Sequence, residues 1–141
     1  VSIDQNGNVT GDISIDMQSL TVDDLQGQSK KVLERHLKSD DFFGTELHST
    51  AGLSFNSTNR FTDDGFQLFN GNLTIKGISN AVEFSAKLIK QSPRLHAVGK
   101  LVFDRSKFDV RFRSGSFFDD LGNKLILDDI EVDITLIANP V

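Results

Sequence analysis

The sequence contains no cysteine, no tryptophan and no tyrosine. Without thiols the chain cannot form disulfides, thiolate metal sites or a cysteine nucleophile. Its aromatic apolar side chains are all phenylalanine, twelve among 141 residues. Phenylalanine has neither a hydroxyl group nor a ring N–H, so these rings can line a dry interior without hydrogen-bond partners. This composition suits a cavity that holds hydrocarbon, and it suits an ordinary packed core equally well.

Clustered positive charge and long apolar runs are also missing. The formal net charge is −5, whereas nucleic-acid binding needs clustered lysine and arginine that neutralise phosphates, so we expect no nucleic-acid partner. No stretch approaches the roughly 18–20 consecutive apolar residues of a membrane-spanning helix, so we expect no membrane span. The length fits a single domain, residues 1–141.

Alternation of apolar and polar residues predicts strands over most of the chain. Val9 to Met17 alternates strictly, and a short strand from Val1 to Gln5 precedes it. The two are joined by Asn6-Gly7, a dipeptide typical of tight hairpin turns. The last predicted strand runs from Leu125 to Ile137. With about eight strands and short connections, we expect a mainly β fold, an antiparallel up-and-down barrel whose closure leaves no exposed edge.

Two segments depart from this pattern. Between Asp23 and Ser39 the apolar residues follow helical spacing, which predicts one amphipathic helix, after the second strand, that starts behind Gly27. Gly71 interrupts the strand predicted over residues 66–76, so we expect a bulge or bend there.

Polar residues give only weak signals of a functional centre. The glycine patterns of dinucleotide, P-loop and hydrolase sites are absent from the sequence. Four of the five Asp doublets are best interpreted as turns or solvated strand edges. His36, Asp40, Asp41 and His48 form the only group that a metal could use. We favour instead a His36 that caps the helix end or contacts a carboxylate, and we expect no metal, no cofactor and no catalytic residue.

Two bulky apolar residues, Phe42 and Phe43, follow two acids directly after the predicted helix. Their rings must be buried, either as a plug that closes one end of the barrel or as a lid that contacts a ligand. Arg105 lies in an Asp-Arg-Ser-Lys segment typical of a turn. Regular alternation would turn this arginine toward solvent, whereas from a turn it can reach a buried carboxylate or an anionic head group.

Four short stretches carry a recognisable signature. They are H-L-K-S-D-D-F-F at residues 36–43, G-N-L-T-I-K-G-I at 71–78, F-D-R-S-K-F at 103–108 and D-I-E-V at 129–132. In this order and spacing they resemble the YceI-like family, lipocalin-like periplasmic or secreted domains associated with the binding of polyisoprenoids and other long-chain lipids. The departures from the family pattern, at Ser49, Ala81 and Asp109, fall in turns.

The resemblance implies a non-enzymatic domain, periplasmic or secreted, that carries or stores a long-chain amphiphilic lipid such as a polyisoprenoid, a quinone or a fatty-acid derivative. Together with the alternation it places the lipid inside the barrel. The expected inward contacts are Ile13, Ile15, Met17, Leu53, Phe55, Leu73, Ile75, Phe84, Leu88, Leu101, Phe103, Phe108, Ile130, Val132 and Ile134. The head-group candidates are His36, Asp41 and Arg105, and the helix with Phe42 and Phe43 forms the lid.

Other interpretations stay open. Small inward residues, Gly11, Ala51, Ala86, Ala97 and Gly99, leave room for a guest or merely fit a tapered barrel that is packed solid. A packed barrel would be a structural or protein-interaction module, and a hydrolase or isomerase acting on a bound lipid is the remaining alternative. Family members have a further strand ahead of the position of Val1, so we expect a trimmed chain, or else a homodimer that pairs through the gap.

Overall fold

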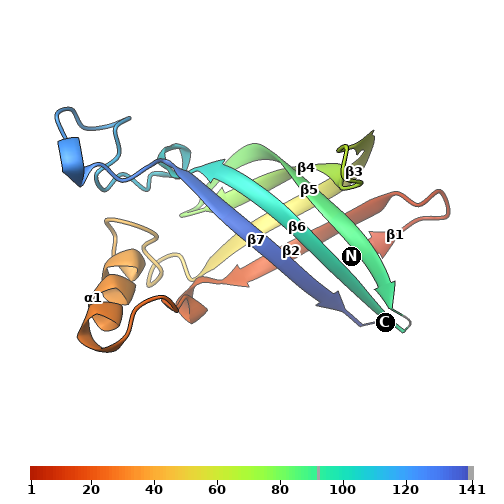
Figure 1. The fold of residues 1–141 in the computed structure, drawn as a ribbon, viewed down its shortest axis with the longest axis horizontal. Coiled ribbons are helices and arrows are strands. Elements are labelled where there is room, and N and C mark those ends of the chain that lie inside the picture. Colours follow the sequence, from red (N-terminus) through yellow and green to blue (C-terminus); the bar gives the residue numbers. More distant parts are fainter. Residues whose placement is uncertain (92, 140–141) are drawn as a thin grey trace.

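Seven antiparallel strands form one continuous sheet in which neighbours in the chain are neighbours in the sheet (Figure 1). The computed structural model describes residues 1–91 and 93–139. The strands are β1 (Ser2–Ile3), β2 (Val9–Asp16), β3 (Thr50–Phe61), β4 (Gln67–Ile75), β5 (Ile78–Gln91), β6 (Arg94–Asp104) and β7 (Asp129–Ala138).

One α-helix, α1 (Gly27–Lys38), follows the second strand. Short 3-10 helices lie at Met17–Ser19, Arg105–Phe108 and Gly122–Lys124. The predicted mainly β, up-and-down fold with one helix after the second strand is confirmed. In Figure 1, α1 and the long connection between β6 and β7 lie at the same end of the sheet. Among the described residues, no helix is long and apolar enough to cross a membrane.

The sheet is a curled half-barrel with two open borders. Within residues 1–91 and 93–139, β7 pairs only with β6, and β1 pairs with β2 only at Val9 and Thr10. The rest of β2, from Gly11 to Asp16, pairs with β3 alone. The expected closure of the barrel is therefore corrected to an open, curled half-barrel, whose seven strands in the described residues agree with the prediction of about eight. Alternation predicts strands one at a time, and it carries no information about whether the first and last of them meet.

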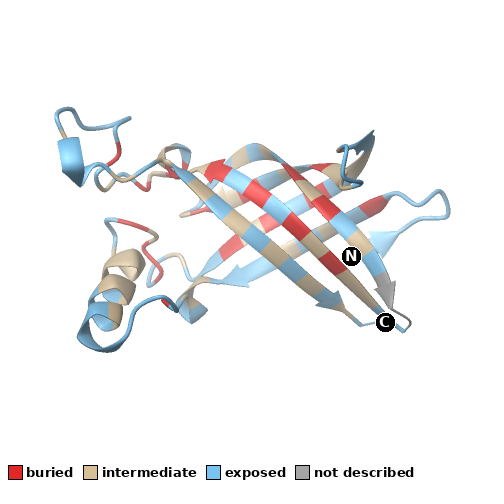
Figure 2. Ribbon diagram, in the orientation of Figure 1, coloured by how far each residue is buried: buried red, intermediate tan, exposed pale blue. Residues whose placement is uncertain are grey.

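Alternation along each strand gives the sheet an apolar concave face and a polar outer face. The register places Ile13, Leu53 and Leu73 side by side, and it places Phe69 beside Phe84. The buried core lies on the concave face, where Val9, Leu53, Phe55, Phe69 and Phe84 are among its members. Figure 2 shows the resulting stripes, with buried residues concentrated in the middle strands.

Gly71 explains one departure from the sequence prediction. It lies in regular register opposite Phe55 and Val82, so the bulge expected there is wrong. A Cβ atom at this position would lie 2.6 Å from the carbonyl oxygen of Ser54, so a glycine is required for the close approach of β3 and β4. The register shift of β3 lies instead between Ser57 and Phe61.

Candidate functional site

The predicted inward residues share the concave face. Ile13, Met17, Leu88, Ile130, Val132 and Ile134 are partly buried and pack against the core. Leu53, Phe55, Leu73, Ile75, Phe84, Leu101, Phe103 and Phe108 belong to the buried core itself. Ile15, next to the end of β2, is 42% exposed and is the outlier of the set. The set thus covers the face from one open border to the other.

Three phenylalanine rings fill the middle of this face. The rings of Phe69 and Phe84 stack with 5.1 Å between centroids, and Phe55 meets them edge-on at 5.8 and 5.7 Å. The Phe55 ring lies over Gly11, because a Cβ atom at position 11 would fall 2.5 Å from Phe55 Cζ. The small residue at position 11 therefore makes room for a ring of this chain and not for a guest.

A cavity of about 40 Å³ remains beside these rings, in the half of the barrel away from α1. Its lining is entirely apolar and is drawn from both borders and from the strands between them. The lining residues are Val1, Val9, Ile13, Leu53, Phe55, Phe69, Phe84, Ala86, Leu88, Leu95, Ala97, Val98, Gly99, Ile134 and Leu136. A water needs about 10–15 Å³ on this measure, and ligand pockets reach about 300–1,000 Å³, so this cavity alone cannot hold a long lipid.

The concave face is half exposed along its open borders. The inward residues of β7, such as Ile134 and Leu136, are only partly buried, and no residue of this strand is fully buried (Figure 2). The inward residues of β6, such as Gly99 and Leu101, are buried, because β6 has a strand on each side and β7 has one. Apolar side chains that stay in contact with water are the ones that an apolar ligand can cover favourably.

Side chains of the chain itself close the end beside α1. Phe42 is 6% exposed and belongs to the core, and Leu37 and Phe43 pack against that core. The Phe42 ring lies 5.1 Å from His36 and 5.6 Å from Phe112 between centroids, and His36 lies 4.4 Å from Phe112. This packing favours the interpretation of Phe42 as a plug over that of a movable lid.

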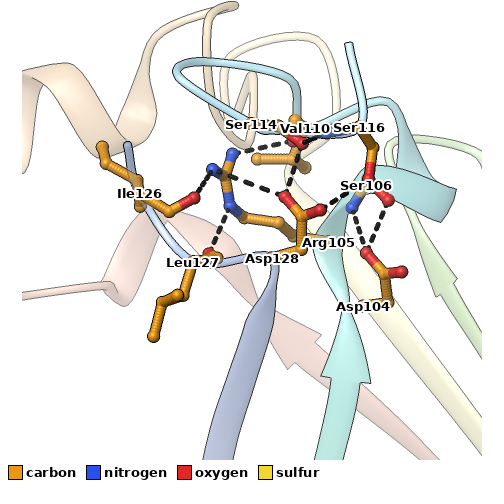
Figure 3. Close-up of polar contacts among 9 residues, drawn as sticks. All are labelled: Asp104, Arg105, Ser106, Val110, Ser114, Ser116, Ile126, Leu127 and Asp128. Atoms are coloured by element: carbon orange, nitrogen blue, oxygen red, sulfur yellow. Dashed lines mark hydrogen bonds and ion pairs between the residues drawn. The ribbon is translucent and has the colours of Figure 1, made fainter. Parts of the chain in front are cut away.

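Arg105 holds this closed end together from inside (Figure 3). Its side chain is 1% exposed. Nε donates to the carbonyl of Leu127 at 3.0 Å, and the two Nη atoms donate to the carbonyls of Val110 and Ile126 at 2.9 Å each. One Nη also lies 3.8 Å from a carboxylate oxygen of Asp128. Because Arg105 binds the carbonyls of residues 126 and 127, β7 begins at Asp129 and not at the predicted Leu125.

Asp128 completes the network. The hydroxyl groups of Ser114 and Ser116 donate to its two carboxylate oxygens. These hydrogen bonds hold the pKa of Asp128 below its usual range, and the positive charge of Arg105 lowers it further. Partial burial acts in the opposite direction and raises the pKa. Burial lowers the pKa of Arg105, and the negative charges of Asp128 and Asp104 oppose this shift. A guanidinium group nevertheless remains charged in proteins.

Lys76 connects the turn between β4 and β5 to the closed end. The two-residue turn between β4 and β5 consists of Lys76 and Gly77, which both have positive φ, 52° and 74°. The ammonium group of Lys76 donates to the carbonyls of Asp40 and Asp109 at 3.1 and 3.0 Å. The turn is thereby fixed to the β6–β7 connection and to the segment that contains Phe42, residues 39–49, which we call the plug segment.

The three predicted head-group residues all lie at the closed end, and none of them lines the cavity. Nε2 of His36 lies 4.0 Å from a carboxylate oxygen of Asp41, which is the carboxylate contact that the sequence analysis favoured for this histidine. Each guanidinium nitrogen of Arg105 donates to a backbone carbonyl. In residues 1–91 and 93–139, no three His, Asp or Glu side chains gather closely enough to hold a metal ion.

A sequence model of the YceI-like domain matches residues 1–138. The chain belongs to the YceI-like family. Among solved structures, this YceI-like chain is similar to BcnA of Burkholderia cenocepacia, with 21% identity, a TM-score of 0.68, and coverage of 92% of this chain and 74% of that one. It is also similar to a mutant Campylobacter jejuni YceI protein, with 19% identity, a TM-score of 0.66, and coverage of 94% and 73%. A search of curated proteins gave no match.

Sequence reasoning missed several residues of this YceI-like site. Phe69 is 2% exposed and stacks on Phe84, and its place in the alternation with Leu73 and Ile75 is a signal that could have found it. Ser114 and Asp128 gave no such signal, because only the folded β6–β7 connection brings them to Arg105.

Proposed function

We propose that this YceI-like domain binds a long-chain amphiphilic lipid, and carries or stores it, without catalysing a reaction. The observation that carries the proposal is the concave face, which is predominantly apolar and remains half exposed along β2 and β7. A hydrocarbon tail on this face gains roughly 25 cal/mol per Å² of apolar surface removed from water and needs no directional contacts. The resemblance to the family favours a polyisoprenoid, a quinone or a fatty-acid derivative.

The tail would lie in the open side of the half-barrel, over the cavity and between the two borders. Ile13 of β2 and Ile134 of β7 both line the cavity, so one tail can touch both. Full burial of a methylene group is worth about 0.8 kcal/mol, or roughly fourfold in affinity. In a half-open site we expect affinity to rise with tail length by less than this for each methylene.

The proposal is for binding alone because general acid–base chemistry requires titratable groups beside the ligand. The cavity lining offers only apolar side chains, and the ionic groups Arg105 and Asp128 are engaged in the closed end. An extracytoplasmic location is part of the proposal and rests on the family resemblance.

A second candidate is a packed half-barrel that serves as a structural or protein-interaction module. The packed rings of Phe55, Phe69 and Phe84 and the small volume of the cavity favour it. In that case the exposed border of β7 would be covered by protein, and no lipid would be found.

Native mass spectrometry of the purified protein, followed by organic extraction, separates the two candidates. We expect one long-chain lipid per protein, and the same spectrum gives the monomer-to-dimer ratio. Ile134→Asp places a charge on the concave border and should abolish lipid capture. Thr135→Asp, the next residue along β7 but on the exposed outer face, should preserve it. A protein that is empty and takes up no added fatty acid or quinone, or equal losses in both folded variants, would contradict the proposal.

A further inference from the structure

The connection between β6 and β7 carries four exposed large apolar side chains. Phe117, Phe118, Leu125 and Leu127 are 42%, 50%, 46% and 74% exposed. We call these four residues the apolar tip. Single exposed apolar residues are normal on soluble proteins, whereas several on one projecting loop mark an interaction surface.

The backbone beneath the apolar tip is fixed from inside. The amides of Phe117 and Phe118 donate to the carbonyl of Ser114 at 3.2 and 3.0 Å, and Ser114 is fully buried. On the other side of the loop, the carbonyls of Ile126 and Leu127 accept from Arg105 (Figure 3). These hydrogen bonds hold the backbone on both sides of the apolar tip.

Charges of both signs surround the apolar tip, because the exposed Asp119 and Asp120 directly follow Phe118. The guanidinium of Arg111 lies 4.5 Å from the centre of the Phe117 ring, and Lys124 is exposed between the two apolar pairs. At the same end of the molecule, α1 carries four Lys and Arg residues and a single acid, although the whole chain has a net charge of −5. The three acids at positions 40, 41 and 46, in the segment after α1, balance this excess of cations. Apolar insertion must therefore supply most of any attraction.

We propose that the apolar tip docks this domain on a lipid bilayer. A convex loop with aromatic and aliphatic side chains can enter the boundary between head groups and acyl chains, while Lys124 extends toward lipid phosphates. Arg111 remains paired with Asp109. The docking end is the closed end of the half-barrel, opposite the cavity. Docking is therefore independent of the lipid-binding function proposed above, and each can fail without the other.

The absence of tryptophan and tyrosine allows a reporter without background fluorescence. Phe118→Trp should shift its emission to shorter wavelength on addition of vesicles of equimolar phosphatidylcholine and phosphatidylglycerol. Phe61→Trp is the matched control, because Phe61 is 62% exposed at the end of β3 that lies away from α1. No shift at position 118, or an equal shift at both positions, would overturn the proposal.

Co-sedimentation with vesicles measures how much binding is lost when the apolar tip is altered. The double variant Phe117→Ser, Phe118→Ser should bind the same vesicles at least about tenfold more weakly, since each ring loses its insertion. Its melting temperature should be unchanged because both rings are exposed, and Phe61→Ser should bind like the unaltered protein. Lack of vesicle binding by the unaltered protein would refute docking. If the double variant changes the molar mass measured by sedimentation in solution but leaves vesicle binding unchanged, the apolar tip contacts a second copy of the chain and not a bilayer.

Discussion

Replacing Arg105 with methionine keeps the length of the side chain but removes every hydrogen bond at the centre of the closed end. Three carbonyls, those of Val110, Ile126 and Leu127, lose their donor, and Asp128 loses its cation. Removal of one partner from a buried charged network typically costs about 3–5 kcal/mol. Domains of this kind have about 5–15 kcal/mol of stability in total. We therefore expect Arg105→Met to lower the melting temperature by about 10 °C or more.

Urea unfolding followed by far-ultraviolet circular dichroism measures this loss, since the chain has no tryptophan to report by fluorescence. Arg111→Met is the matched control, because Arg111 is 58% exposed and its ion pair with Asp109 lies at the surface. Such pairs contribute about 0–1 kcal/mol. Arg105→Lys retains the charge without the planar fork and should fall between the two variants. The structural role of Arg105 is refuted if Arg105→Met is no less stable than Arg111→Met.

Two further predictions follow from single contacts. Gly11→Ala brings Cβ to 2.5 Å from the Phe55 ring and should cost about 1–3 kcal/mol in urea unfolding; combining it with Phe55→Leu should recover part of the loss, and strictly additive losses would contradict the clash. Asp128→Asn tests the lowered pKa of Asp128, whose stabilising effect is present above the ordinary carboxyl pKa of about 3.9 and disappears as the pH falls through the folded-state value. The variant should be less stable than the parent at pH 7, with a gap that narrows as the pH falls below about 4, and a gap independent of pH would contradict the assignment.

Local features of the fold were predictable from the sequence because their signals are local. Strict alternation at residues 9–17 and the Asn6-Gly7 turn correspond to β2 and the hairpin before it. The change to helical spacing behind Gly27 corresponds to α1, Gly27–Lys38. The same alternation placed the inward residues on one face, because side chains on a strand change face at every step.

Features that depend on distant residues were not predictable in this way. The open border between β2 and β7 is a property of the whole sheet, which no single strand encodes. Gly11 appeared to leave space for a guest, but its register partner Phe55 fills that space. The start of β7 shifts to Asp129 because Arg105, more than twenty residues earlier, binds the carbonyls before it.

Each of the four stretches that carry the family resemblance contributes to the closed end, although Leu73, Phe103 and Ile130 within them also lie on the concave face. The first contains the plug residue Phe42, the second contains Lys76, the third contains Arg105, and the fourth begins β7 directly after Asp128. No cavity-lining residue falls within any of them. These stretches therefore help to close one end of the half-barrel, whereas other residues line the cavity. Substitutions at lining positions such as Ala97 and Ile134 can reshape the cavity without disturbing the closure.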